Sequence, residues 1–420
     1  MFAKFGKSKM LSPLRGRAFR RVFAGSGLAM LADQMFFIAL TLLVLDVAGP
    51  GLQLGSVLAV AAVPGAALML FGGWVSDRVS PVLVLVFSNA GRAILTGILA
   101  AIVVSDSVAL WHLYALAGFL GVLDAFHYPA SLSVVPKVVK KESLAPANAL
   151  VQGAEQFGGL VGPALAAAAV AFVGLGATFG AFALMFLATS LVVASAVRVP
   201  PEFSGGDGTE GPLAVSGSKE GARSSGGIVE GLKYVWRDPV IRMIMVLFTA
   251  MSFAAIGPIL VGGAALASER LGGAASLGIL LSAFGGGSLA GLAVSSFGMP
   301  SSGRRGLVML AVMGVFGVFL GSIGFASGIV SASILAAGAG AALGYLGVVM
   351  VTWLQERADD AFTGRVMSLV MLAAVALDPA SYAFAGFLTA LGMEVLFASA
   401  GAVVILAVIA GASSRELRKF

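Results

Sequence analysis

The sequence predicts an all-α membrane protein whose twelve transmembrane helices form two six-helix bundles. Of its 420 residues, 59% are hydrophobic and only 11% are charged, and the mean hydropathy is +1.01. Because a soluble domain has about a quarter of its residues charged, most of this surface must face lipid. Twelve apolar stretches are long enough to cross a bilayer, and one polar segment separates the first six from the last six.

The spans follow from the length of each apolar stretch, since a spanning helix needs about 20 mostly apolar residues. The expected spans are 22–45, 53–75, 81–104, 107–128, 147–172, 176–197, 240–266, 275–297, 306–325, 329–353, 365–389 and 392–411. Basic residues favour cytoplasmic loops. With the amino terminus inside, the inner segments hold 24 of the 26 Lys and Arg residues, seven of them in the first 21 residues. We therefore expect both chain ends in the cytoplasm.

The polar middle segment divides the chain. Residues 200–227 contain eight Gly and five Ser and have no helical period, which predicts a flexible linker. Apolar residues then recur at one-face spacing from Ile228 to Trp236, which predicts a short amphipathic helix on the inner leaflet. The expected parts are a basic amino terminus (1–21), an amino-terminal bundle (22–197), a cytoplasmic linker with the amphipathic helix (198–239), a carboxyl-terminal bundle (240–411) and a cytoplasmic tail (412–420).

Several function classes are excluded by composition. The chain has no Cys, so it cannot hold a disulfide, a thiolate zinc site or a Cys nucleophile, and its two His are too few for a His-based metal cluster. The net charge of +6 follows membrane topology, so we expect no nucleic-acid partner. There is no GxxxxGK phosphate loop and no nucleophile paired with a base within the spans. We expect neither an enzyme nor a bound cofactor.

Five ionisable residues fall inside predicted spans: Asp33, Arg92, Asp124, Glu155 and Asp378. Such a residue costs about 2.5–3.5 kcal/mol at a helix centre and is a functional candidate by default. Counted from the inner ends of their spans, Asp33 and Arg92 lie at a common depth of roughly 16–18 Å, so they could pair. Asp124 and Glu155 are expected to be shallower, roughly 6–12 Å from the inner surface, and Asp378 is near mid-depth in the second half.

The hypothesis is that Asp33 is the main carboxylate for proton and substrate, with Arg92 tuning it and Asp378 as a second candidate. A carboxyl group in an apolar cavity takes up a proton readily, because desolvation disfavours its charged form. The alternative is a structural Asp33–Arg92 pair that fixes the first helix to the third. Asp124 and Glu155 could carry protons or could pair with Lys or Arg of the inner loops.

Gln34, Phe36 and Phe37 neighbour Asp33 in the sequence. An acid, an amide and aromatic rings would form a substrate pocket suited to cationic amphiphiles. The alternative is that either Phe faces lipid or the helix core, since consecutive residues cannot both face one cavity squarely.

The stretch GGWVSDRVSP (72–81) resembles the signature that members of the major facilitator superfamily carry between helices two and three. Gly73, Asp77 and Arg78 match it, whereas Ser80 replaces its later Gly. The resemblance implies an inter-domain lock in which the Asp meets the amino end of helix eleven, and a carboxylate does stabilise that end of a helix dipole. We expect Ser80 to cap the start of the third helix.

The stretch GGLVGPALAA (158–167) resembles the antiporter motif of the same superfamily. Gly158, Gly162 and Ala166 form a small-residue stripe that lets another helix approach closely, and Pro163 can bend its helix. The resemblance implies export. The alternative is ordinary small-residue packing, which is common in membranes.

Three further stretches narrow the resemblance: FHYPA (126–130), EGLKYVWRDP (230–239) and WLQERADDAFTGRVMSL (353–369), in which Gly364 and Arg365 join the expected lock. Together they resemble the bacterial exporter branch that includes the enterobactin exporter and drug and macrolide efflux proteins. The resemblance implies a monomeric, proton-driven exporter of small organic molecules in a bacterial inner membrane, contacting only its substrate and membrane lipid. A lipid or lysolipid flippase or a solute importer on the same scaffold is the alternative, and a sensor or intramembrane enzyme is less favoured.

Overall fold

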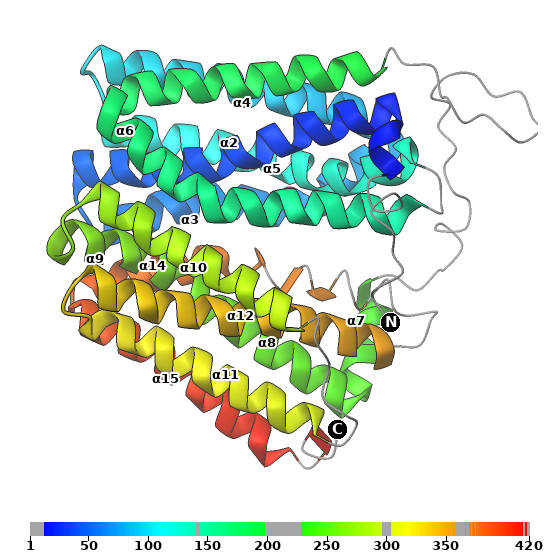
Figure 1. Cartoon of the computed structure of the whole chain (residues 1–420), viewed down its shortest axis with the longest axis vertical. Coiled ribbons are helices and arrows are strands. Elements are labelled where there is room, and N and C mark those ends of the chain that lie inside the picture. Colours follow the sequence, from blue (N-terminus) through cyan, green and yellow to red (C-terminus); the bar gives the residue numbers. More distant parts are fainter. Residues whose placement is uncertain are drawn as a thin grey trace, which may run out of the picture. The chain divides into compact units, whose positions relative to one another are not determined.

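The computed structural model describes residues 12–139, 143–197, 228–295, 304–357, 366, 369–370, 372–373, 375–414 and 416–417, and these residues form helices and no strand (Figure 1). The helices in chain order are η2 (Ser12–Arg15), α2 (Arg17–Ala48), α3 (Leu52–Arg78), α4 (Pro81–Val104), α5 (Leu110–Val138), α6 (Leu144–Val197), α7 (Ile228–Arg237), α8 (Pro239–Gly257), η4 (Pro258–Gly262), α9 (Gly263–Arg270), α10 (Ala274–Ser295), α11 (Arg305–Ser322), η5 (Ile323–Phe325), α12 (Ile329–Arg357), α14 (Asp378–Thr389) and α15 (Met393–Ser413).

The predicted spans correspond to these helices. In the described part of the chain, nine helices are long and apolar enough to cross a membrane. One of them, α6, includes both the fifth and the sixth predicted spans. It bends between the two at Gly174, whose φ of 76° is not helical. The fourth predicted span, 107–128, corresponds to α5, which begins at Leu110 and continues ten residues beyond the expected end at 128. The later part of the eleventh span, 365–389, is α14.

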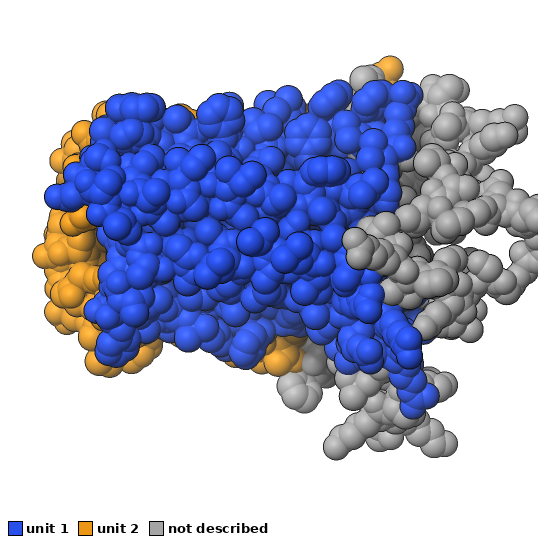
Figure 2. Space-filling model, turned by 90° about the horizontal axis from the view of Figure 1, so that it is seen from above, with its two compact units in different colours: residues 1–40, 63–219 blue, residues 41–62, 220–420 orange. Residues whose placement is uncertain are grey.

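The chain divides into two compact units, coloured separately in Figure 2. The first comprises residues 1–40 and 63–219, and the second comprises residues 41–62 and 220–420. The end of α2 and the first part of α3 therefore belong with the later helices. The bundle boundaries expected from the sequence stay predictions.

The core of the first unit joins four helices. Its buried side chains include Phe19 and Val22 of α2, Leu85 of α4, Val134 of α5 and Val193 of α6. Apolar packing alone does not drive helices together in lipid, so close-fitting contacts of this kind provide the cohesion.

The start of α4 differs in one respect from expectation. The helix begins at Pro81 with Ser80 at the N-cap position, as the sequence predicts, but the Ser80 side chain makes no capping hydrogen bond. Its hydroxyl is buried without a hydrogen-bond partner among the described atoms. The start of this helix therefore depends on Pro81, whose fixed φ suits the first helical position.

In the second unit, glycines bring α10 and α12 into backbone contact. A Cβ added at Gly287 or Gly291 of α10 would overlap the carbonyl groups of Ala337 and Ala341 on α12. Gly340 of α12 is matched in the same way by the backbone of α10. Small residues at such a crossing let two helix backbones approach closely in a membrane.

The Ser381 side chain of α14 inserts between two backbone hydrogen-bonding groups of α8. The Ser381 hydroxyl donates to the Phe253 carbonyl at 2.5 Å and accepts from the Gly257 N–H at 2.9 Å. These two backbone groups are four residues apart and would bond directly in an undisturbed α-helix. The ladder changes to the wider π-helix η4 immediately afterwards, at Pro258. The inserted hydroxyl and the proline together account for this break.

Candidate functional site

Arg92 of α4 contacts two carboxylates from two other helices of the first unit. Its Nη1 donates to both oxygens of Asp33 on α2, at 3.1 Å and 3.0 Å. Its Nη2 donates to Oδ1 of Asp124 on α5. The pairing of Asp33 with Arg92 that their common depth suggested is therefore present, and it has a second acidic member. One guanidinium ties α2, α4 and α5 together, and we call these three residues the Arg92 triad.

The arginine is buried and the acids are accessible. The Arg92 side chain is 5% exposed, whereas those of Asp33 and Asp124 are 39% and 56% exposed. A buried guanidinium cannot lose its proton and so needs anionic partners. The two carboxylates, in contrast, are partly exposed, so a proton or a cation can reach them.

The position of Asp124 corrects one expectation. The sequence predicts Asp124 near the inner surface, within reach of Lys or Arg of the loops, but in the folded chain it pairs with Arg92 instead. The reason is the length of α5, which ends at Val138 rather than near residue 128. Asp124 is therefore roughly 21 Å along the helix axis from that end.

Polar residues on α4 that the sequence prediction omitted surround the arginine. Ser88, Asn89 and Thr96 are buried, and Ser88, Arg92 and Thr96 recur every fourth residue, so they share one face of the helix. The Thr96 hydroxyl and the Asn89 carbonyl oxygen have no hydrogen-bond partner among the described residues. Polar residues at this spacing inside an apolar span are the signal that would have identified this face.

A second polar contact joins α4 and α5 one turn along from the triad. Ser88 Oγ lies 3.2 Å from His127 Nδ1. Ser88 follows the face of α4 that carries Arg92, and His127 is three residues beyond Asp124 on α5. Since Ser88 Oγ is also within 3.2 Å of the Leu85 carbonyl, the hydroxyl can donate there and accept from the imidazole.

Gln34 faces the small-residue stripe of α6. A Cβ added at Gly162 would lie 2.8 Å from the Cβ of Gln34, and the Gln34 side chain also lies against Gly158. In the same stretch, Pro163 and Ala166 are buried. The antiporter-like stretch is therefore the surface on which α6 meets α2, and Gln34 fills that contact.

The aromatic neighbours of Asp33 differ in their surroundings. Phe36 is buried, and its ring centroid lies 5.7 Å from that of Phe179 and 6.5 Å from that of Phe186. This placement favours core packing over substrate contact for Phe36. Phe37, the next residue, is only partly buried.

The remaining candidate acids, Glu155 and Asp378, have no ion pair with the triad among the described residues. Glu155 is exposed on α6 and has no ion-pair partner in the described part of the chain. Asp378 belongs to the second unit, where it occupies the first turn of α14. A carboxylate at that place is favoured by the positive end of the helix dipole.

The expected lock is described only in part. The Arg78 guanidinium lies 4.2 Å from the centroid of the Trp74 ring. The surroundings of Gly73, the side chain of Asp77 and both Gly364 and Arg365 lie outside the described part of the structure. The lock stays a prediction.

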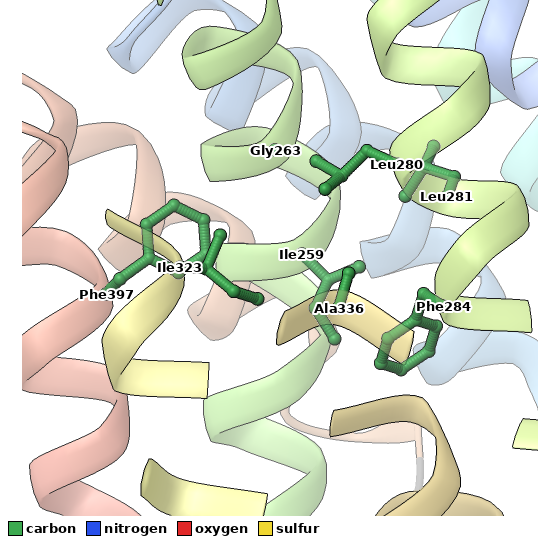
Figure 3. A pocket seen from close by; sticks show the side chains of 8 residues that line it. All are labelled: Ile259, Gly263, Leu280, Leu281, Phe284, Ile323, Ala336 and Phe397. Carbon is green, nitrogen blue, oxygen red and sulfur yellow. The ribbon is translucent and has the colours of Figure 1, made fainter. Parts of the chain in front are cut away.

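An apolar pocket occurs in the second unit (Figure 3). Its empty space, open solvent included, is about 220 Å³. Its lining is Ile259, Gly263, Leu280, Leu281, Phe284, Ile323, Ala336 and Phe397. Since no lining residue is ionisable or polar, this pocket has no group that could bind a proton or a charged substrate.

Comparisons with known proteins extend over nearly the whole chain. Residues 22–377 match the family model of the Major Facilitator Superfamily. An uncharacterized MFS-type transporter of Sinorhizobium fredii, y4rN, is 26% identical over 394 residues, which are 91% of this chain and 91% of that protein.

Two solved structures have the same fold. The nucleoside transporter NupG superposes with a TM-score of 0.72 at 11% identity, covering 94% of this chain and 99% of its own. A peptide transporter, POT, in complex with sulfate gives a TM-score of 0.72 at 13% identity, covering 96% of each chain. These likenesses concern the fold alone. They confirm the predicted all-α membrane fold with its twelve transmembrane helices.

Proposed function

This chain belongs to the major facilitator superfamily and is a multi-pass membrane transporter, and from that premise we propose that it is a proton-coupled antiporter. In this proposal it exports small organic molecules by alternating access, with cationic amphiphiles as the first substrates to test. The resemblance to the bacterial exporter branch, seen in the stretches 126–130 and 353–369, supports the direction of transport.

The observation that carries the proposal is the charge balance of the Arg92 triad. One guanidinium contacts two carboxylates, so the ionised triad has one negative charge in excess. An uncompensated charge inside a membrane is costly. Either a proton or a substrate cation can cancel that charge, and the two then compete for one place.

Competition of this kind would couple the two movements. Facing outward, the triad takes a proton on Asp33 or Asp124. Facing inward, it releases that proton when a cationic or polar substrate binds. We assign the main proton and substrate role to Asp33 and the tuning role to Arg92. Asp124 shares the exchangeable proton, because both carboxylates contact the same guanidinium.

Other residues have supporting roles in the proposal. Asp378 is the second candidate proton site, and Glu155 and Gln34 stay candidates beside it. The close contact between α6 and α2 at Gly162 supports an antiporter-type seal, because a tight helix contact leaves no space for an ion leak.

We further propose a bacterial inner membrane as the location, with both termini in the cytoplasm. The proton gradient is the energy source, without a bound cofactor, and the protein acts as a monomer that contacts membrane lipid and a small-molecule substrate. The seven basic residues ahead of the first span support this orientation.

Transport in proteoliposomes tests the proposal. With ethidium as the cationic probe and an imposed pH gradient, the wild-type protein should accumulate the dye against its concentration gradient. Asp33→Asn and Asp124→Asn should each abolish this accumulation while the protein still inserts and elutes as a single species. Asp46→Asn is the matched control, because it makes the same change on α2 at an exposed position outside the triad.

Wild-type accumulation by Asp33→Asn would contradict the assignment of Asp33 and favour a purely structural pair. In cells, dye efflux that persists after an uncoupler collapses the proton gradient would contradict proton coupling. Dye movement in the opposite direction would identify an importer. Movement of a fluorescent lysolipid, without dye transport, would identify a flippase.

A further inference from the structure

The short helix α7 directly precedes the membrane-spanning helix α8 of the second unit. It ends at Arg237, and α8 begins at Pro239. Between them, Asp238 has an extended backbone and caps α8 by accepting from the N–H groups of Val240 and Ile241 at 2.8 Å and 3.1 Å. The chain therefore changes direction at Asp238, and α7 does not continue the span.

Two stripes of side chains run along α7. Leu232 and Trp236, one helical turn apart, are 44% and 57% exposed. Lys233 and Arg237, also one turn apart, are exposed beside them. Val235 is buried, and it lies on the other side of Leu232 around the helix. The helix thus packs against the protein through the side that carries Val235. The rest of its surface has one apolar stripe and one basic stripe next to each other.

The charges of the second unit show which membrane surface α7 meets. Ion pairs join the start of α8 to the end of α12, through Asp238 and Arg357, and the start of α11 to the same end, through Arg305 and Glu356. In the described part of this unit, these ends and α7 carry every basic residue except Arg270. The opposite helix ends meet at an ion pair between Arg270 of α9 and Glu394 of α15. Because basic residues favour the cytoplasmic side, α7 lies at the inner leaflet.

Asp238 does not offset the charge of the basic stripe formed by Lys233 and Arg237. Partial burial tends to raise the pKa of Asp238, but the hydrogen bonds from Arg357, Ile241 and Val240 and the charge of Arg357 outweigh burial and lower the pKa. Asp238 therefore stays ionised and is balanced by Arg357 at 2.9 Å. Among the described side chains this leaves Lys233 and Arg237 without an acidic partner, and with Glu230 included α7 still has one positive charge in excess.

A further contact fixes the aromatic anchor. Arg242 of α8 donates to the Trp236 carbonyl at 2.9 Å, and its guanidinium lies 5.7 Å from the centroid of the indole ring. Indole rings favour the headgroup level of a bilayer. Trp236 is therefore held in place at the depth where Lys233 and Arg237 reach lipid phosphates.

We propose that α7 is a docking site for anionic phospholipids of the inner leaflet. Leu232 and Trp236 enter the acyl boundary, and Lys233 and Arg237 bind the headgroup phosphates. The argument is one of charge and apolar complementarity, since the cytoplasmic leaflet has a negative surface and a basic amphipathic helix lies in such an interface. It needs the chain to span a membrane with α7 at the inner leaflet, and it does not depend on proton coupling.

Hydrogen exchange of the full chain in nanodiscs tests the proposal. One set of nanodiscs contains phosphatidylcholine only, and in the other a third of the lipid is phosphatidylglycerol. The amides of α7 should exchange at least about tenfold more slowly in the anionic nanodiscs, because each basic residue contributes about fivefold to binding at an anionic surface. High salt should reduce the difference, since it screens exposed charges.

The double variant Lys233→Gln, Arg237→Gln should lose the difference between the two lipids. Arg304→Gln is the matched control, because it removes one positive charge at the same end of the unit without changing α7, and it should keep the difference. Equal exchange of α7 in both lipids would overturn the proposal. Protection of α7 that appears only when a cytoplasmic protein is added would also overturn it, because the occupant would then be a protein.

Discussion

Replacement of Gly344 by alanine should force α10 and α12 apart. Gly344 lies on α12 against Ser288 of α10, where an added Cβ would be 2.8 Å from the Ser288 carbonyl carbon and 2.9 Å from its Cα. Ordinary contact begins at 3.4 Å. The neighbouring atoms are backbone, so no side-chain rotation relieves the overlap. The helices must separate by at least about 0.5 Å, which forfeits a quarter or more of each contact's dispersion energy.

We expect Gly344→Ala to destabilise the second unit by about 2–3 kcal/mol, the upper part of the range for overpacking a close-packed interior, because the overlapped atoms are backbone. Gly347→Ala is the matched control on the same helix, since an added Cβ there meets nothing within 4 Å. The control should be neutral or more stable by up to about 1 kcal/mol, because alanine favours a helix over glycine.

Thermal unfolding in detergent measures the difference. Trp353 lies on α12 and is fully buried, whereas the other three Trp residues are exposed, so the emission change of the buried indole on unfolding reports on this helix. The apparent unfolding temperature of Gly344→Ala should be several degrees below that of Gly347→Ala. Equal unfolding temperatures for the two variants would refute the conclusion that backbone contact between α10 and α12 stabilises the unit.

Two further changes probe the second unit. Ser381→Ala removes the hydroxyl that bridges the Phe253 carbonyl and the Gly257 N–H, and it should cost about 1–3 kcal/mol, measured as a lower unfolding temperature than that of the wild type. Asp238→Asn should remove an acid-sensitive part of the stability. Because the pKa of Asp238 is lowered from 3.8 in the folded protein, its contribution is present above that pH and is lost as the pH falls through the lowered value. Between pH 5 and pH 3, approximately, the wild type should lose more stability than Asp238→Asn, and parallel losses would exclude the Arg357 pair as the cause.

The sequence by itself determined the fold class and predicted a membrane topology. In lipid each backbone polar group must bond within its own helix, so every span appears as one long apolar stretch. The distribution of basic residues then fixes the expected orientation. The same local information placed Asp33 and Arg92 inside two spans at one depth, which is why their ion pair could be expected from the order of the residues alone.

Tertiary structure decided which residues meet. The place of Asp124 could not be read from the sequence, because α5 stays helical through Tyr128 and Pro129 and continues ten residues beyond the apolar stretch. The insertion of Ser381 into α8 joins residues more than a hundred positions apart. A sequence specifies the period of each helix, but the rotation of one helix against another follows from packing among all of them. For that reason the third member of the Arg92 triad and the break in α8 became visible only in the folded chain.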